Sequence, residues 1–527
     1  MNLQPPVSRK EALLSRGQIE GMIAEGGSII IVNQKVLNVG AWLAYHPGGY
    51  KAIQHMIGRD ATDEVTVLHS TETCASMSRY QIGRVQGRWK NFVPPIQGGT
   101  FREHVPESKG MQKPGCISGE TSRVPSPTFD TESAAVRQRP EKSHMDNASL
   151  TSFSSVTESE DQGGPSFLDI QTRREILLDL SKYLALDEVT QDEIVRKYRL
   201  LHDQIHAEGL YQCNYMAYAW EFAGCATLFS LMLFFLRSGW YCTSGAFMGM
   251  FWSQLVFAAH DAGHMGITHN FIIDTMIGMI IAAPIGGLSL GWWKRTHNVH
   301  HIVTNSPEHD PDNQHLPVFA VNHRFLDNIF STYHERLLPY DAIAKFLVPY
   351  QAVQEKGQLG GIDGDRWELF WLWFGYGIVY KSIPTGWNRF GFIMISHMIN
   401  MPLHVQFTVS HFAMSTTDLG PDESFAQKML RTTMDVDCVP WLDFFHGGLQ
   451  FQAIHHLFPR VPRHNLRRTQ KLVQDFCNDV NIPYALYGFL DGNKKVVGTL
   501  AEVSRQAAIL AKCQRTIAQS GEIFHGN

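Results

Sequence analysis

Long uncharged runs begin after about residue 216, and four of them form two pairs. The first pair is 222–236 and 240–259, and the second is 369–380 and 390–414. A membrane-spanning helix needs about 20 predominantly apolar residues. Trp and Tyr lie near the ends of these runs, as is typical of side chains at a membrane interface. The pattern therefore predicts four transmembrane helices arranged as two hairpins.

The rest of the chain differs from these runs in composition. The first 95 residues mix apolar and charged positions as a globular domain does, whereas residues 100–165 are rich in Ser, Thr, Pro and Gly. Such a segment has too few large apolar groups to offset the entropy of ordering. The sequence predicts five parts: a globular domain at 1–95, a disordered linker at 96–165, a soluble helical segment at 166–214, a membrane domain at 215–475 and a cytosolic tail at 476–527.

The net charge and the cysteine content indicate which partners and which cellular compartment to expect. The net charge is -5 and the isoelectric point is about 6.6, so we expect no nucleic-acid partner. The eight cysteines are dispersed and form no CxxC pair, which is typical of reduced thiols facing the cytosol. Residues 1–20 contain no apolar stretch of the kind that a secretory signal needs.

The number and grouping of the histidines indicate chemistry that the hydropathy pattern alone does not show. The chain has 25 histidines, of which five precede residue 200. The mean hydropathy of -0.16 averages an apolar region and a polar half. Three clusters lie at or near the ends of the apolar runs, and their candidate metal ligands are His260, His264, His297, His300, His301, Gln452, His455 and His456.

The spacing within each cluster is helical. Residues three and four apart lie on one face of a helix, so HxxxH, HxxHH and QxxHH each aim their ring or amide groups the same way. So many imidazoles with few carboxylates can bind Fe, Zn, Cu or Ni, and their number suits two metal ions, of which iron is the redox-active choice. Asp261 and Asn298 are candidates for orienting the ligand rings.

The three clusters must meet on one side of the membrane to form one site. The uncharged run 275–293 lies between the first two clusters, and it contains Pro284, Gly286 and Gly287. We therefore expect this run to be interfacial or buried in a cytosolic cap. Both termini are then cytosolic. His411 lies at the cytosolic end of the fourth span, where it is expected to complete the metal shell.

A second histidine motif lies in the N-terminal domain. His46-Pro-Gly-Gly is followed by Gly58-Arg-Asp-Ala-Thr and then by His69-Ser. Two histidines on opposite faces of a planar macrocycle leave no open iron position, which suits electron transfer. This region resembles the cytochrome b5 family over about residues 25–90. The resemblance implies a small α+β domain that holds heme b through His46 and His69.

Residues 215–470 resemble the membrane fatty-acyl desaturases. GWWKRTHNVHH, HDPDNQHLP and FHGGLQFQAIHHLFPRVPRHNL are similar to the front-end desaturases that carry a fused cytochrome b5 domain, in which Gln replaces the first His of the third box. This chain has QAIHH where that subgroup has QIEHH. The long linker and HDAGHMGITHN are most similar to fungal sphingolipid Δ8-desaturases.

The resemblance implies a mainly α fold: a four-span membrane domain with a cytosolic histidine-box cap, plus the heme domain. It also implies two iron ions, O2, a membrane lipid substrate, a multi-pass location in the endoplasmic reticulum membrane, and electrons from NADH through cytochrome b5 reductase. The expected reaction is Δ8-desaturation of the sphingoid long-chain base of a ceramide or other sphingolipid. A front-end fatty-acyl desaturase (Δ6 or Δ5 type) and a lipid hydroxylase stay open as alternatives, whereas a non-enzymatic heme carrier leaves the three boxes unexplained.

Overall fold

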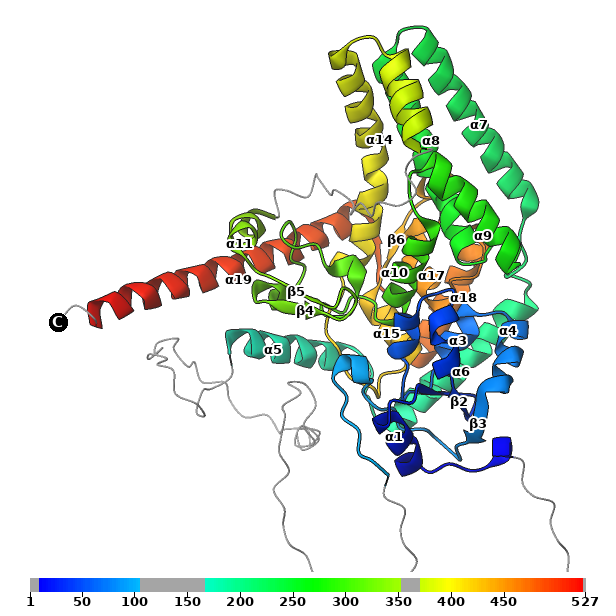
Figure 1. The fold of residues 1–527 in the computed structure, drawn as a ribbon, viewed down its shortest axis with the longest axis vertical. Coiled ribbons are helices and arrows are strands. Elements are labelled where there is room, and N and C mark those ends of the chain that lie inside the picture. The colour runs from blue at the N-terminus through cyan, green and yellow to red at the C-terminus, as the bar shows by residue number, and fades with distance from the viewer. Residues whose placement is uncertain (1–8, 105–165, 352–369, 525–527) are drawn as a thin grey trace, which may run out of the picture.

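A computed structural model describes residues 9–104, 166–351 and 370–524 of the chain. Figure 1 shows a small N-terminal domain at one end, a group of long helices at the other, and an irregular middle region between them. The middle region, against which the N-terminal domain packs, contains α10 (Leu290–Ile302), α15 (Phe425–Thr432), α17 (Gln452–Leu457) and α18 (Leu466–Val480). Long apolar helices thus lie on one side of this region and the N-terminal domain on the other.

The N-terminal domain is α+β, as predicted. Its antiparallel sheet has the order β1-β2-β3, and Asn33 and Gln34 turn the chain with positive φ between the first two strands. Ile29, Ile31 and Val36 of this sheet are buried against α1. The elements are β1 (Ile29–Val32), β2 (Lys35–Asn38), β3 (Gln81–Arg84), α1 (Arg16–Ala24), α2 (Tyr50–Gln54), α3 (Thr62–Leu68) and α4 (Thr71–Ser76).

The predicted linker begins too early. Residues 96–104 lie against the N-terminal domain, because Phe101 packs on Phe92 and Arg102 pairs with Glu20 at 3.3 Å. One aromatic side chain in a polar stretch is enough to hold this short segment against an apolar surface. The rest of the predicted linker, 105–165, lies outside the described residues.

Two helices follow, where the sequence predicts a helical segment. They are α5 (Phe167–Lys182), capped by Ser166, and α6 (Glu188–Ala207), capped by Asp187. The apolar face of α6 packs on α18 (Leu466–Val480). The buried Tyr198 hydroxyl donates a hydrogen bond to the carbonyl of Leu457 at 2.8 Å, which ties α6 to the third histidine box.

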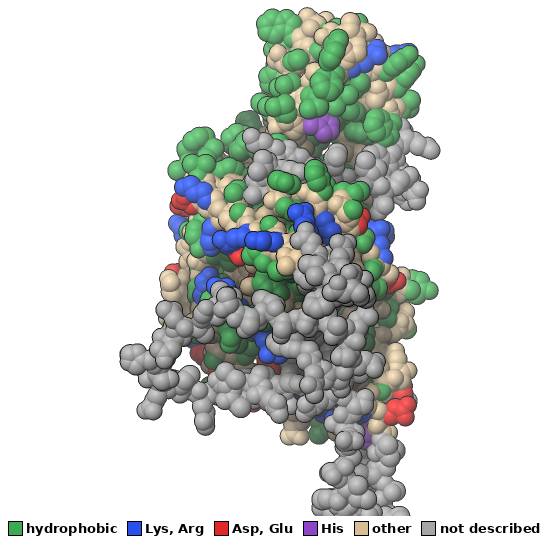
Figure 2. Space-filling model, turned by 90° about the vertical axis from the view of Figure 1, so that its left-hand side faces the viewer, with side chains coloured by type: hydrophobic (Ala, Val, Ile, Leu, Met, Phe, Trp, Pro, Cys, Tyr) green, Lys and Arg blue, Asp and Glu red, His purple; other side chains and the backbone are tan. Residues whose placement is uncertain are grey.

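The long helices form the apolar end of the molecule. They are α7 (Tyr215–Arg237), α8 (Tyr241–Gly263), a π-helix (Trp371–Ser382) and α14 (Gly386–Phe412). Gly245 and Gly249 of α8 face backbone carbonyls of α14, so the two helices approach closely. Figure 2 shows apolar side chains over this end, and large ones such as Trp220 and Trp387 are exposed.

Fewer helices have the length and apolar composition of a membrane span than the sequence predicts. In the described ranges, α7 alone qualifies, and a second candidate appears if the bent pair 271–285 and 290–302 counts as one span. The prediction of four spans is therefore not reproduced by this criterion. The physical reason is that α8 and α14 carry His, Ser and Asn side chains that lower their hydropathy, and the π-helix has 12 residues.

The ambiguous run at 275–293 is broken, as its Pro and Gly residues predict. It contains α9 (Phe271–Ile280), a π-helical turn (Ile281–Ile285) and the start of α10 (Leu290–Ile302). The two halves meet at 114°. The indole nitrogen of Trp252 donates a hydrogen bond to the carbonyl of Ile285 at 3.2 Å, so α8 holds the bend. This break lets α10 run through the middle region rather than continue α9.

The middle region is built from short elements around an apolar cluster shared by α6, α15, α17 and α18. β4 pairs antiparallel with β5, and β6 pairs parallel with β7. The elements are β4 (Ile329–Ser331), β5 (Arg336–Leu338), α11 (Ala342–Leu347), α15 (Phe425–Thr432), β6 (Asp435–Asp437), α16 (Asp443–His446), α17 (Gln452–Leu457) and β7 (Leu486–Gly488).

The predicted C-terminal tail is largely structured. It starts inside α18 and contains α19 (Phe489–Phe524), a helix of 36 residues. Val496, Leu500 and Val503 of this helix are buried against Val348 and other apolar side chains. An apolar stripe at helical spacing therefore anchors the first half of the predicted tail to the middle region.

Candidate functional site

Four helices bring the predicted metal ligands together. His260 lies in the last turn of α8, and His264 is its C-cap. The second box lies on α10, the third on α17, and His411 in the last turn of α14. The helical spacing of each box aims its rings inward, as the sequence predicts. All eight histidines are buried or nearly so.

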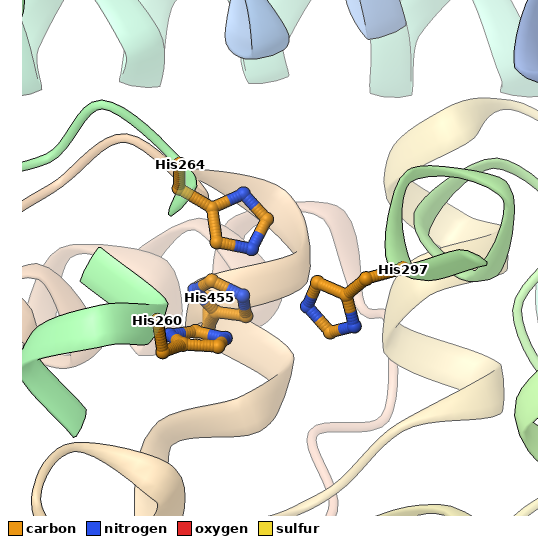
Figure 3. A group of neighbouring side chains, drawn as sticks. All are labelled: His260, His264, His297 and His455. Carbon is orange, nitrogen blue, oxygen red and sulfur yellow. The ribbon is translucent and has the colours of Figure 1, made fainter. Parts of the chain in front are cut away.

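The first group contains His260, His264, His297 and His455. One nitrogen of each ring lies within 4.8 Å of one nitrogen of every other ring. Figure 3 shows the rings converging from different segments. The second group contains His300, His411 and His456 under the same limit, so the structure brings the predicted His411 to the other box histidines.

His301 lies between the two groups. Its Nε2 is 3.1 Å from Nε2 of His297 and 3.1 Å from Nε2 of His455, and its ring stacks on His456 with centroids 4.3 Å apart. Imidazole nitrogens at about 2 Å from one ion are roughly 3 Å from each other when adjacent. These spacings fit shared metal ligation, and two neighbouring groups fit two ions.

Several ring nitrogens of these histidines are free to bind a metal. His264 Nε2, His301 Nδ1, His411 Nδ1 and His456 Nε2 are buried and have no hydrogen-bond partner. A buried polar atom without a partner costs about 1–3 kcal/mol, which a metal bond would offset. Burial, followed by the neighbouring histidines, keeps the pKa values of His455 and His456 well below the usual range, so both rings are neutral.

The structure places Asp261, Asn298 and Gln452, for which the sequence predicts roles at the metal site, in different surroundings. Asp261 accepts a hydrogen bond from the Tyr218 hydroxyl, and its Oδ1 lies 3.7 Å from Nδ1 of His260, so it is placed to orient that ring. Asn298 was expected to do the same; its side chain packs against Gly48 of the N-terminal domain, and its role toward the ligand rings stays a prediction. Gln452 is buried one turn before His455, and its ligation stays a prediction.

The sequence reasoning missed the carboxylates that orient the second box. Asp310 is fully buried and accepts hydrogen bonds from His300 Nδ1 at 2.8 Å and from the Asn305 backbone N–H at 2.7 Å. Asp312 lies 3.7 Å from His297 Nδ1. Such partners fix which ring nitrogen faces a metal. The signal was the HDPDN segment soon after the box, in which acidic residues follow histidines closely.

Trp293 packs against histidines of both the first and the second box. Its ring stacks on His297 with centroids 4.5 Å apart and lies 5.4 Å from His260 and 5.6 Å from His264. The indole also covers Gly263, at which a Cβ would overlap the ring. The absence of a side chain at 263 therefore allows this packing.

Gly263→Ala is expected to lower the metal content and the activity by roughly 10–100-fold, because it displaces Trp293 and with it His297. Gly291→Ala is the matched control, since a Cβ there meets no atom within 4 Å. Metal analysis of the purified protein measures the effect. A Gly263→Ala protein with a full metal complement would show that the contact does not position the box.

The N-terminal histidines fit a heme. The rings of His46 and His69 face each other with centroids 6.0 Å apart. Two metal–imidazole bonds of about 2 Å each, with the half-widths of two rings, span about this distance. His46 Nδ1 donates to the carbonyl of Gly49 at 2.8 Å and His69 Nδ1 to that of Val65 at 3.0 Å, which leaves both Nε2 atoms free as ligands. Burial lowers the pKa of His69 to about 4, so its ring is neutral.

Comparison with known proteins agrees with these sites. The fatty acid desaturase model matches residues 238–488, and the cytochrome b5-like heme/steroid binding domain model matches residues 18–86. The Delta 8-(E)-sphingolipid desaturase of Emericella nidulans is 52% identical over 97% of this chain and 98% of its own length. The proteins of the same name from Komagataella phaffii and Kluyveromyces lactis are 44% and 43% identical, over 96% and 98% of this chain and 96% and 97% of their own lengths. The chain therefore belongs to the fatty acid desaturase family, among the members that carry an N-terminal cytochrome b5-like domain.

Proposed function

We propose that the protein introduces an E double bond at position 8 of the long-chain base of a sphingolipid. The observation that carries the proposal is the pair of adjacent histidine groups, in a chain that aligns over its full length with Delta 8-(E)-sphingolipid desaturases. In this reaction each of two neighbouring carbons loses a hydrogen. O2 takes up these hydrogens together with two further electrons and protons and is released as water.

Two iron ions are the proposed metals. His260, His264, His297 and His455 would hold one, and His300, His411 and His456 the other, with His301 between them. When bound, the irons supply the redox chemistry that reduces O2 and oxidises the unactivated carbons. The protein contributes imidazole ligands, the orienting carboxylates Asp261 and Asp310, and a site shielded from water, which prevents side reactions.

The proposed setting is the endoplasmic reticulum membrane, with four spans and both termini cytosolic. The exposed apolar residues of α7 and α14 support this arrangement, as does the position of the histidine groups at the ends of α8 and α14. We propose that NADH–cytochrome b5 reductase supplies electrons to the heme held by His46 and His69. The heme domain contacts α6 through Arg199–Asp63 at 2.7 Å and the desaturase domain through Lys51–Glu335 at 2.8 Å.

Lipid analysis tests the proposed reaction. The chain is expressed in a host whose sphingolipids lack this double bond, and the long-chain bases are released and measured by mass spectrometry. We expect a base that is two hydrogens lighter, with the double bond located at position 8 by oxidative cleavage. A vector without the gene is the control. A new double bond in fatty acids alone, or a new hydroxyl group on the base, would overturn the proposal.

His46→Ala is expected to remove the heme absorbance and to lower the product in cells by about tenfold or more. The fused domain has an effective concentration in the millimolar range, so the host's free cytochrome b5 replaces it poorly. Iron content should stay at the wild-type level, which separates loss of electrons from loss of folding. Wild-type product formation by a heme-free variant would contradict electron delivery through the fused domain.

A further inference from the structure

Two cationic side chains of the desaturase domain lie beside the axial histidines of the heme domain. Arg460 follows the third box, and its Nη1 donates a hydrogen bond to the carbonyl of His69 at 2.7 Å. Lys294 lies on α10, three residues before the first histidine of the second box. Beyond the larger effect of burial, the Lys294 charge lowers the pKa values of both His46 and His69, so it is near both rings.

The same helix covers the loop that carries His46. The aliphatic part of Arg295 packs on Gly49, which has a φ of +84°, and Asn298 packs on Gly48. α10 therefore touches one axial loop of the heme domain, and the segment after α17 touches the other. Together they close the edge of the domain between its two ligand loops.

The carboxylates whose charge acts on these two cations lie beyond ion-pair distance: Asp274 acts on both, and Glu72 acts on Arg460. Among the described residues, no ion pair within 4.0 Å includes Lys294 or Arg460. Arg460 is 8% exposed, and its Nε is buried without a hydrogen-bond partner. Lys294 is partly buried, with its Nζ 5.3 Å from the centre of the Phe271 ring. Keeping unpaired cations in such places is costly unless a ligand brings negative charge.

We propose that Lys294 and Arg460 bind the carboxylates of the heme, so that the desaturase domain completes the heme site. This inference rests on the heme that the cytochrome b5-like domain implies, and heme b carries two propionates. Val32, Met56 and Val65 of the heme domain form one apolar cluster with Val299 and Ile302 of α10, so the two domains are in direct contact. Charge-assisted bonds to carboxylates are about twice as strong as neutral ones.

The arrangement gives α10 two tasks. Arg295 and Asn298 contact the loop that carries His46, whereas His297, His300 and His301 of the same helix belong to the metal groups. Heme binding would therefore fasten the heme domain to the helix that holds the metal ligands. Release of the heme and separation of the two domains would then be thermodynamically coupled.

The test uses the purified full-length protein, freed of heme and reloaded with either heme b or its dimethyl ester, which lacks both carboxylates. Transfer of heme to excess apomyoglobin measures its release. Lys294→Gln and Arg460→Gln are each expected to speed release of heme b by about tenfold, as the loss of one charge-assisted hydrogen bond implies. They should also make the heme midpoint potential more negative, because each lost positive charge disfavours the reduced form.

Comparing heme b with its dimethyl ester distinguishes binding of the heme carboxylates from a purely structural role of Lys294 and Arg460. In the wild type, the ester should leave faster than heme b, and neither substitution should speed its release further. Arg468→Gln is the matched control, because this exposed arginine pairs with Glu208 at 2.8 Å away from the heme. Equal acceleration with both hemes, or unchanged release of heme b in both variants, would overturn the proposal. The assay needs no lipid substrate, so its outcome is independent of the proposed reaction.

Discussion

Replacing His301 by alanine is expected to abolish product formation while the heme absorbance stays intact. Its Nε2 lies 3.1 Å from one nitrogen each of His297 and His455, and its ring stacks on His456, so its loss disturbs both metal groups. Changes to residues that only orient metal ligands cost about 10–100-fold in affinity or activity. Loss of a ligand between two groups should exceed 100-fold.

A comparison with His411→Ala makes the prediction more specific. His411 belongs to the second group alone, and the first group keeps its four imidazoles without it. We expect about half of the wild-type iron per heme in His411→Ala and less in His301→Ala, with no product from either. Iron and heme are measured on the same purified sample, so heme serves as the internal standard.

His206→Gln is the control for these two variants, because this exposed histidine of α6 stacks on Tyr211 outside both groups. It should keep the full iron content and activity. Wild-type iron in both His301→Ala and His411→Ala would show that the histidine groups are not the metal sites.

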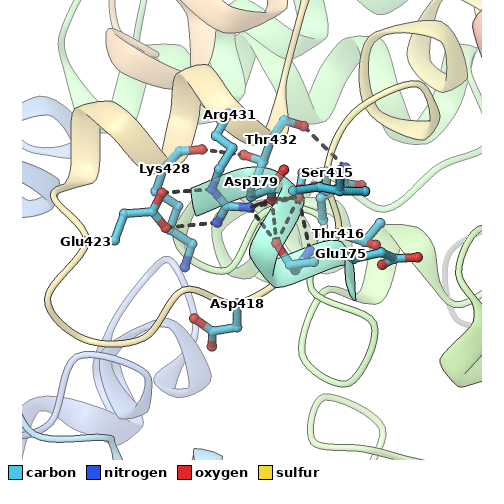
Figure 4. Close-up of polar contacts among 12 residues, drawn as sticks. Glu175, Asp179, Ser415, Thr416, Asp418, Glu423, Lys428, Arg431 and Thr432 are labelled. Atoms are coloured by element: carbon cyan, nitrogen blue, oxygen red, sulfur yellow. Dashed lines mark hydrogen bonds and ion pairs between the residues drawn. The ribbon is translucent and has the colours of Figure 1, made fainter. Parts of the chain in front are cut away.

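Replacing Arg431 by methionine is expected to destabilise the desaturase domain by about 3–5 kcal/mol. Its side chain is fully buried and binds both carboxylate oxygens of Glu423 at 2.8 Å and Asp179 at 3.0 Å (Figure 4). These carboxylates raise the pKa of Arg431 against the opposing effect of burial. Without the arginine, two buried or nearly buried carboxylates lose their counter-charge.

The position of this network explains why its loss should matter to the site. Arg431 also donates to the Ser415 hydroxyl at 2.8 Å, just after α14. Asn305 donates to the carbonyls of His411 at 2.9 Å and Ser415 at 3.0 Å. The arginine thus links α5, through Asp179, to the segment that carries a predicted metal ligand.

Thermal unfolding of the detergent-purified protein measures the effect. Arg431→Lys should recover part of the stability, because lysine restores the charge without the planar two-bond contact to Glu423. Combining Arg431→Met with Glu423→Gln should also be milder than Arg431→Met alone, since one uncompensated charge is removed. Arg468→Met, which breaks an exposed pair with Glu208, should cost at most about 1 kcal/mol. A melting temperature for Arg431→Met close to that of Arg468→Met would contradict the prediction.

The spacing of residues along the chain was sufficient to identify both sites. HxxxH and HxxHH place imidazoles on one helix face whatever surrounds them, because helix geometry is local. His46 could be identified in the same way, because the glycine-rich turn in which it lies is also a local feature of the sequence. The Pro and Gly residues at 284–287 likewise predicted the break between α9 and α10, since proline and glycine act on their own backbone.

The assignment of ligands to metal groups needed the tertiary structure. His455 and His456 are neighbours in sequence, yet they belong to different groups, and His297 and His300 divide in the same way. Successive helical residues point about 100° apart, so one box can serve two ions only where other helices bring the remaining ligands. The positions of α8 and α14 decide this, and no local pattern encodes them.

The contact between the two domains also depended on the fold. Lys294, Asn298 and Arg460 are ordinary polar residues in the sequence, and the resemblance to known families assigned the second box to metal alone. Asn298 and Arg460 contact residues 48 and 69, respectively, which are more than 200 positions away in sequence. Sequence by itself determined the ligand chemistry through local helix geometry; the tertiary structure determined which ligands share an ion and what faces the heme, because those contacts form between distant segments.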